Sequence, residues 1–216
     1  MELDPEARAI LAPYVHDGRV DYAALAKNRD LDDLIARIGA YDPAADSRDE
    51  QLAFYLNAYN LLTINTVLQR LRRNPQWPGA VSPGAKLRFF LLRRHRVAGK
   101  VMSLLTLENG VIRRRFGDPR IHFALNCASR SCPPLPVSLF IGAEVDADLE
   151  RLTSEFINSS EVRYDAATNT LSASRIFKWY RKDFGPSVVG FIAQYRDVPA
   201  DASVAFHHYD WRLNSL

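Results

Sequence analysis

The 216-residue chain contains only two cysteines, Cys127 and Cys132, which are too few for a disulfide-rich scaffold. Four residues separate them, and no second Cys/His pair lies nearby to complete a tetrahedral zinc site. His207 and His208 are alternative metal ligands, but adjacent residues of a strand point to opposite faces. We therefore expect neither a bound metal nor a cofactor.

The sequence also lacks the features of several protein classes. Its first residues have neither the basic nor the apolar region of a secretory signal, so we expect a cytoplasmic location unless a leader precedes this chain. No charged residue occurs from Gln51 to Gln69, but three asparagines and two threonines make a membrane span costly there, and we expect a buried central helix. Repeats, heptads and low-complexity runs are absent. The length and the 47% apolar content predict one domain over residues 1–216, of unknown oligomeric state.

Acidic residues are scarce in the middle of the chain. Residues 51–132 contain 14 Lys/Arg but only two acids, Glu108 and Asp118. This asymmetry favours either an anionic partner or, more simply, pairing of the basic segment with the acidic ends of the chain. The segment has no helix-turn-helix, zinc-finger or RNA-recognition pattern, so nucleic acid is not the expected partner. We expect a small-molecule or peptide substrate.

Hydrophobic periodicity and turn residues predict a helix-rich α+β domain. Helices are expected at 5–12, 31–38, 47–73, 87–92, 104–116, 146–157, 176–184 and 186–195. Strands are expected at 96–102 around a glycine turn, at 120–127, in a hairpin of 162–165 with 170–173, and at 204–211. Residues 74–84 contain three prolines and two glycines, which indicates a loop suited to covering a site.

The most informative segment is residues 121–134, which places His122 and both cysteines in eleven residues. A free thiol is only a few per cent ionised at neutral pH, and a nearby imidazolium or Arg130 would raise that fraction. On a regular strand His122 and Cys127 point apart, unless a turn begins at Asn126. Cys132 is freer to return over His122, so the spacing favours neither thiol as a nucleophile. Inert buried cysteines and a Cys127–Cys132 disulfide are the alternatives.

Other polar residues could complete such a site. Glu108 could orient the imidazole of His122, although its spacing favours a salt bridge to Arg113. Asn57 and Asn60 share one helix face and could hold a substrate carbonyl, or clamp a loop backbone. Asn126 and Arg130, beside the first cysteine, are further candidate substrate-binding residues.

Several motifs resemble the uncharacterised family known as domain of unknown function 547. They lie at residues 18–22, 52–60, 118–129, 131–135, 176–180, 183–184 and 209–214. That family looks distantly similar to papain-like and transglutaminase-like thiol enzymes, which implies a central helix packed on a small, mainly antiparallel sheet.

The resemblance implies His122 as base, Cys127 or Cys132 as nucleophile and Glu108 as orienting acid. Two features depart from papain-like enzymes. The central helix carries Asn57 and no cysteine, and both cysteines follow the histidine.

Two functions compete at this stage. The first is a cysteine-dependent hydrolase or acyl transferase acting on a peptide, amide or thiol-containing small molecule. The second is a non-catalytic binding module for an anionic peptide or a glutathione-like ligand.

Overall fold

The long helix α4 (Arg48–Arg73) is the centre of the fold, as shown by a computed structural model that describes residues 3–216. Ser47 caps it: its side chain accepts from the Glu50 N–H, while the Glu50 carboxylate accepts from the Ser47 N–H. This reciprocal capping box explains why the helix begins where the sequence predicts. The uncharged run is buried on all sides, which confirms the predicted central helix. No helix within residues 3–216 has the length and apolar character needed to cross a membrane.

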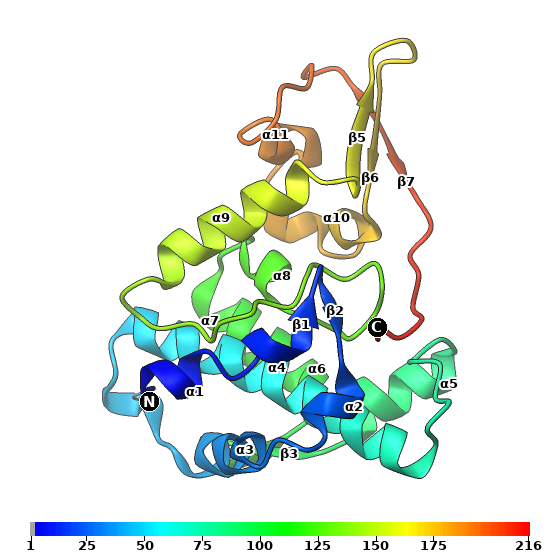
Figure 1. The fold of residues 1–216 in the computed structure, drawn as a ribbon. Coiled ribbons are helices and arrows are strands. Elements are labelled where there is room, and N and C mark those ends of the chain that lie inside the picture. The colour runs from blue at the N-terminus through cyan, green and yellow to red at the C-terminus, as the bar shows by residue number, and fades with distance from the viewer. Residues whose placement is uncertain (1–2) are drawn as a thin grey trace.

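Other helical segments surround α4 (Figure 1). Those before residues 121–134 are α1 (Pro5–Arg8), η1 (Ala12–Tyr14), α2 (Tyr22–Leu25), α3 (Asp30–Ala40), η2 (Pro43–Ala45), α5 (Pro83–Lys86), η3 (Leu87–Leu92), α6 (Leu104–Thr106), η4 (Leu107–Arg113) and α7 (Arg114–Phe116). Those after it are α9 (Val145–Ile157), α10 (Arg175–Trp179), η5 (Arg181–Phe184) and α11 (Val188–Ile192). The main contacts of α4 are with α3, α9 and the continuous stretch α6–η4.

The strands form three small sheets. They are β1 (Val15–His16) with β2 (Arg19–Val20), β3 (His95–Val97) with β4 (Lys100–Met102), and β5 (Val162–Asp165) with β6 (Thr170–Ala173) and β7 (Ser203–Phe206). All pairs are antiparallel except β6 with β7, which is parallel. The predicted α+β class is confirmed, together with the hairpin of β5 and β6.

One predicted strand is wrong. Residues 120–127 form a short helix, α8 (Ile121–Ala124), followed by an extended segment. The Asp118 carboxylate accepts from the Arg120 N–H, and its carbonyl accepts from the Ile121 N–H, so this pair of bonds starts a helical turn. All four residues of α8 are buried, which removes the polar face that would have revealed a helical period.

Three other segments are shorter than predicted. The first helix ends at Arg8, the predicted helices of 176–195 are three short turns, and the last strand ends at Phe206. Beyond β7 the chain runs back along the molecule and ends near β2 (Figure 1). This return places residues 209–214 beside the segment that follows α8.

The proline-rich loop of 74–84 is fastened to this returning segment. The Leu213 N–H donates to the Pro78 carbonyl, and a Cβ at Gly79 would lie 2.7 Å from the Trp211 carbonyl oxygen. The ring of Trp77 stacks on Phe89. Pro83, at the end of the loop, is its one residue that reaches the cavity described below.

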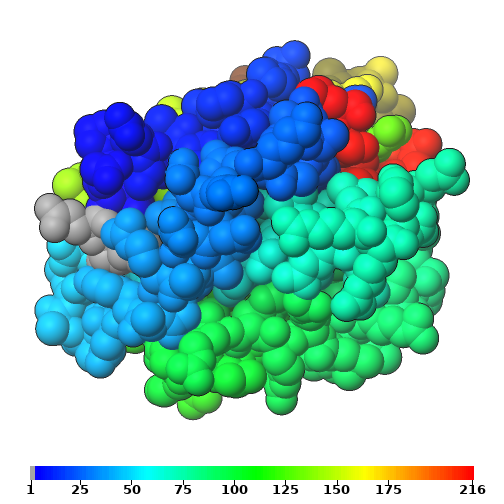
Figure 2. Space-filling view, turned by 60° about the horizontal axis from the view of Figure 1, so that its bottom comes forward, coloured from blue at the N-terminus to red at the C-terminus, as the bar shows by residue number. Residues whose placement is uncertain are grey.

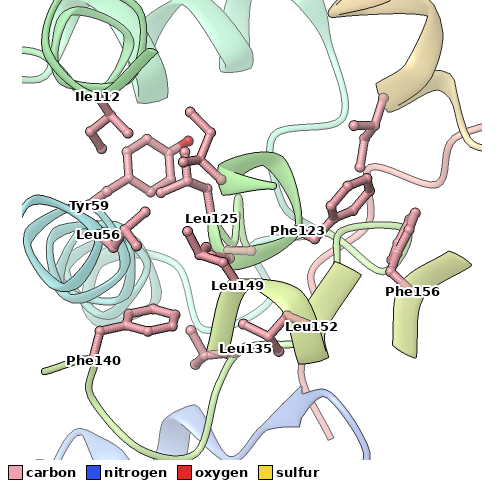
Figure 3. Packing of buried hydrophobic residues seen from close by; sticks show 14 of the residues in the cluster. Leu56, Tyr59, Ile112, Phe123, Leu125, Leu135, Phe140, Leu149, Leu152 and Phe156 are labelled. Atoms are coloured by element: carbon pink, nitrogen blue, oxygen red, sulfur yellow. The ribbon is translucent and has the colours of Figure 1, made fainter. Parts of the chain in front are cut away.

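The buried side chains form one hydrophobic core. In Figure 3, Tyr59 of α4 lies between Ile112 and Leu125, and Phe123 of α8 faces Phe156 of α9. Phe123 also contacts Phe177, at 5.6 Å between ring centroids. The core therefore anchors α8 on both sides, which fixes the position of His122 on the same turn.

Candidate active site

A cavity of about 420 Å³ opens beside α8. Its wall contains all four residues that the sequence analysis selects for catalysis: Glu108, His122, Cys127 and Cys132. The rest of the wall comes from α4, α5, η3, α6, α10 and the returning C-terminal segment.

Asn60 of α4 holds the backbone between the histidine and the first cysteine. Its Nδ2 donates to the Ala124 carbonyl at 2.9 Å, and its Oδ1 accepts from the Asn126 N–H at 2.9 Å. Asn57 clamps Phe140 with a matching pair of bonds. These two asparagines are therefore loop clamps outside the cavity wall, which is the second of the two roles that their spacing allows.

A tight turn follows at Cys127. The Asn126 Oδ1 accepts from the Ala128 N–H, and its Nδ2 donates to the Pro133 carbonyl. Ala128 has φ of +61°, a left-handed conformation that is costly for a residue with a side chain. The turn brings Cys127 to the wall that His122 also lines. Asn126 is thus a turn-forming residue.

Cys127 is partly buried and unoxidised, with two hydroxyl groups beside its sulfur. Ser129 Oγ lies 3.0 Å and Tyr209 Oη 3.2 Å from Sγ. Burial raises the pKa of Cys127, but hydrogen bonds from Cys132, Ser129 and Tyr209 outweigh it and lower the pKa to about 7. A thiol with this pKa is substantially ionised at neutral pH.

The pKa of Cys132 shifts in the opposite direction from that of Cys127. Its sulfur accepts from the Cys127 N–H at 2.8 Å. Burial and the neighbouring Cys127 raise the pKa of Cys132 well above its ordinary value. Both cysteines are free thiols, and Cys127 is the one whose pKa is lowered.

The ring of His122 contacts a carboxylate that the sequence analysis did not select. Its Nε2 lies 2.7 Å from Asp183 Oδ2, and Arg113 donates to both oxygens of the same carboxylate at 2.7 and 2.8 Å. The hydrogen bond with His122, together with Arg113, holds the pKa of Asp183 well below its usual range. The imidazole also stacks on Tyr180, with 4.0 Å between ring centroids. Nδ1 has no hydrogen-bond partner among residues 3–216, and neither sulfur is hydrogen-bonded to the ring in that part of the chain.

Glu108 contacts neither His122 nor Arg113 through a hydrogen bond. Its buried carboxylate accepts from Tyr59 Oη at 3.1 Å and from Tyr180 Oη in a shorter bond. The ion pair expected between Glu108 and Arg113 is replaced by the pair of Arg113 with Asp183. Tyr180 links Glu108 to the histidine, because its hydroxyl donates to the carboxylate and its ring stacks on the imidazole.

Arg130 and the basic middle segment can also be placed. Arg130 is exposed and lines a different cavity, and within residues 3–216 no hydrogen bond joins its side chain to Cys127. Arg113 and Arg120 do pair with acids from the second half of the chain, as the simpler interpretation of the charge asymmetry expects. No group of three or more His, Cys, Asp or Glu side chains in residues 3–216 is arranged to hold a metal ion.

The family described as "Protein of unknown function, DUF547" matches residues 43–157, slightly more than half of the chain. The chain belongs to this family. No curated protein and no solved structure matches this chain. The DUF547 match includes His122 and both cysteines, whereas Asp183 and Tyr209 lie beyond it. The site of this DUF547 protein is therefore assembled from the matched segment and from the C-terminal part of the chain.

Proposed function

We propose that this protein is a cysteine-dependent hydrolase or acyl transferase, with Cys127 as nucleophile, His122 as general base and acid, and Asp183 as the residue that orients the histidine. The observation that carries the proposal is the presence of an ionisable thiol and a carboxylate-bound imidazole on the wall of one cavity. These are the parts that nucleophilic catalysis at sulfur requires. The arrangement corresponds functionally to that of papain-like enzymes, with another chain order of the residues.

The chemistry takes place in two stages. Cys127 first passes its thiol proton to Nδ1 of His122, and the thiolate attacks the carbonyl carbon of an acyl donor. A C–S bond forms, and the bond from carbon to the leaving group breaks as His122 passes that proton to the leaving group. Water, or an acceptor hydroxyl, amine or thiol, then attacks the thioester. His122 takes its proton, and the thiolate of Cys127 is released.

The orientation of the His122 ring determines which of its two nitrogens can exchange a proton during the reaction. With Nε2–H donated to the ionised Asp183, the imidazole carries its lone pair on Nδ1, which has no partner among residues 3–216. Nδ1 is therefore the atom available to exchange a proton with thiol, leaving group or water.

Turnover of p-nitrophenyl and thioester model substrates tests the proposal. Cys127→Ala is expected to abolish turnover, and Asp183→Asn to lower kcat by about two to four orders of magnitude, since an unoriented imidazole adopts the wrong tautomer. The matched control is Asp146→Asn, because Asp146 is an exposed carboxylate that also pairs with an arginine. Thermal unfolding of each variant separates loss of chemistry from loss of fold. Turnover that persists in Cys127→Ala would refute Cys127 as the nucleophile, whereas a wild-type protein without any turnover would leave the binding-module function as the better account.

A further inference from the structure

Much of the cavity wall is apolar. Besides polar residues such as Glu108 and Lys86, it contains large hydrocarbon and aromatic side chains. They are Leu87, Phe90 and Leu91 of η3, Leu105 of α6, Trp179 and Trp211. The segment of 75–92 and the segment of 95–110 lie side by side in Figure 2, and η3 packs against α6.

Several of these side chains are exposed although they line the cavity. Leu87 is 48% exposed, Leu91 39%, Leu105 40% and Trp179 44%. Nine large apolar side chains of residues 3–216 are exposed to this degree, and four of them surround this one cavity. Concentrated exposed apolar surface at the mouth of a cavity is typical of a site that takes an apolar ligand.

A positive charge without a counter-ion lies in the same wall. Lys86 Nζ is 3.7 Å from the ring centroid of Trp211, and no carboxylate of residues 3–216 lies within 4 Å of it. Partial burial lowers the pKa of Lys86, while negative charge at Cys127 opposes this shift. Lys86 and Cys127 thus line the same cavity. An anionic group of a bound ligand would supply the missing counter-charge.

We propose that the substrate is an anionic amphiphile, namely an ester or thioester whose extended acyl chain lies against the leucines of the mouth and whose acidic group meets Lys86. This inference rests on the proposed function, since it places the acyl carbonyl at Cys127. A peptide with polar side chains would leave the exposed leucines without partners, so it fits this wall less well.

Binding and turnover are measured separately to test it. Binding uses saturated fatty acids from hexanoate to decanoate, read by tryptophan fluorescence, on the wild-type protein and on Cys127→Ala. We expect affinity to rise by up to about fourfold for each added CH₂, because each methylene leaves water for an apolar wall. Decanol, of equal chain length and without charge, is expected to bind more weakly than decanoate, and Lys86→Gln to remove that difference. Turnover uses p-nitrophenyl esters of the same chain lengths.

Residues at the mouth of the cavity are exposed, so they can be substituted without disturbing the packing of the core. Leu91→Gln and Leu105→Gln are expected to flatten the dependence of affinity on chain length. Val137→Gln is the matched control, since Val137 is 47% exposed and lies outside this cavity. Cys127-dependent turnover without any chain-length preference, and without competition by decanoate, would overturn the inference while leaving the proposed function intact. Decanoate binding with the expected chain-length dependence, but without Cys127-dependent turnover, would instead refute the proposed function.

Discussion

Tyr209→Phe tests whether hydroxyl groups around the sulfur make Cys127 a nucleophile. The substitution removes one donor, at 3.2 Å from Sγ, and keeps the ring packed between Trp179 and Trp211. A hydrogen bond to a charged group contributes about 1.5–3 kcal/mol, and one pKa unit corresponds to about 1.4 kcal/mol. Because Ser129 and Cys132 remain beside the sulfur, we expect the pKa of Cys127 to rise from about 7 by about one unit.

The consequence is measurable as a rate. At pH 7 the ionised fraction of Cys127 would fall from about one half to about one tenth, so alkylation by iodoacetamide should slow about fivefold at that pH. Above pH 9 the two proteins should react at similar rates. Peptide mass spectrometry assigns the label to Cys127 or Cys132. Tyr195→Phe is the control, because its hydroxyl bonds to Glu150 on the surface. Identical pH profiles for Tyr209→Phe and the wild type, both with midpoints above 8, would refute the reasoning.

Two further predictions concern folding stability. Asn60→Ala leaves the Ala124 carbonyl and the Asn126 N–H without their hydrogen-bond partners, so we expect the free energy of unfolding, measured with denaturant, to fall by about 2 kcal/mol or more. An unchanged unfolding midpoint would contradict the proposed role of Asn60 as a loop clamp. Burial, assisted by Arg93, lowers the pKa of His95 to about 4, so the folded state keeps this residue neutral where the unfolded chain protonates near pH 6.5. Stability should therefore be complete above pH 6.5 and fall by about 3 kcal/mol as the pH drops towards 4. In His95→Gln the free energy of unfolding should depend less on pH between 6.5 and 4. An equally steep dependence in the variant would contradict the assignment of this effect to His95.

Local signals were sufficient for much of the fold. The helix predicted over 47–73 begins directly after the Ser47 cap, and the helix predicted over 104–116 ends at Gly117, with φ of +64°. The Asp17–Gly18 turn between β1 and β2 likewise has positive φ at both residues. In each case a few adjacent residues determine the backbone, so the sequence alone was enough.

The segment around His122 shows where local signals fail. An apolar run of this length fits a buried strand or a buried helix equally well, and the deciding Asp118–Pro119 start lies outside the run. Because α8 is helical, the alternation of faces predicted for His122 and Cys127 does not apply. The position of both residues on the wall of one cavity depends on the clamp by Asn60 and on the left-handed turn at Ala128.

Sequence spacing could not identify the residues that contact His122 and Cys127. Asp183 is 61 residues from His122 in the sequence, and Tyr209 is 82 residues from Cys127. Both lie in motifs that carry the family resemblance, so those motifs were the only signal that could have indicated them. Glu108 was the acid selected from the sequence as a partner of the histidine, but two tyrosine hydroxyls donate hydrogen bonds to its carboxylate.

A covalent intermediate on Cys127 is the most direct test of the account. The protein is mixed with p-nitrophenyl decanoate at neutral pH, quenched in acid within seconds, and digested for peptide mass spectrometry. The account predicts a decanoyl adduct on Cys127 that forms in the Cys132→Ser variant and is absent from Cys127→Ala. Release of p-nitrophenol at the same rate in Cys127→Ala, with no acylated cysteine in the wild type, would contradict it.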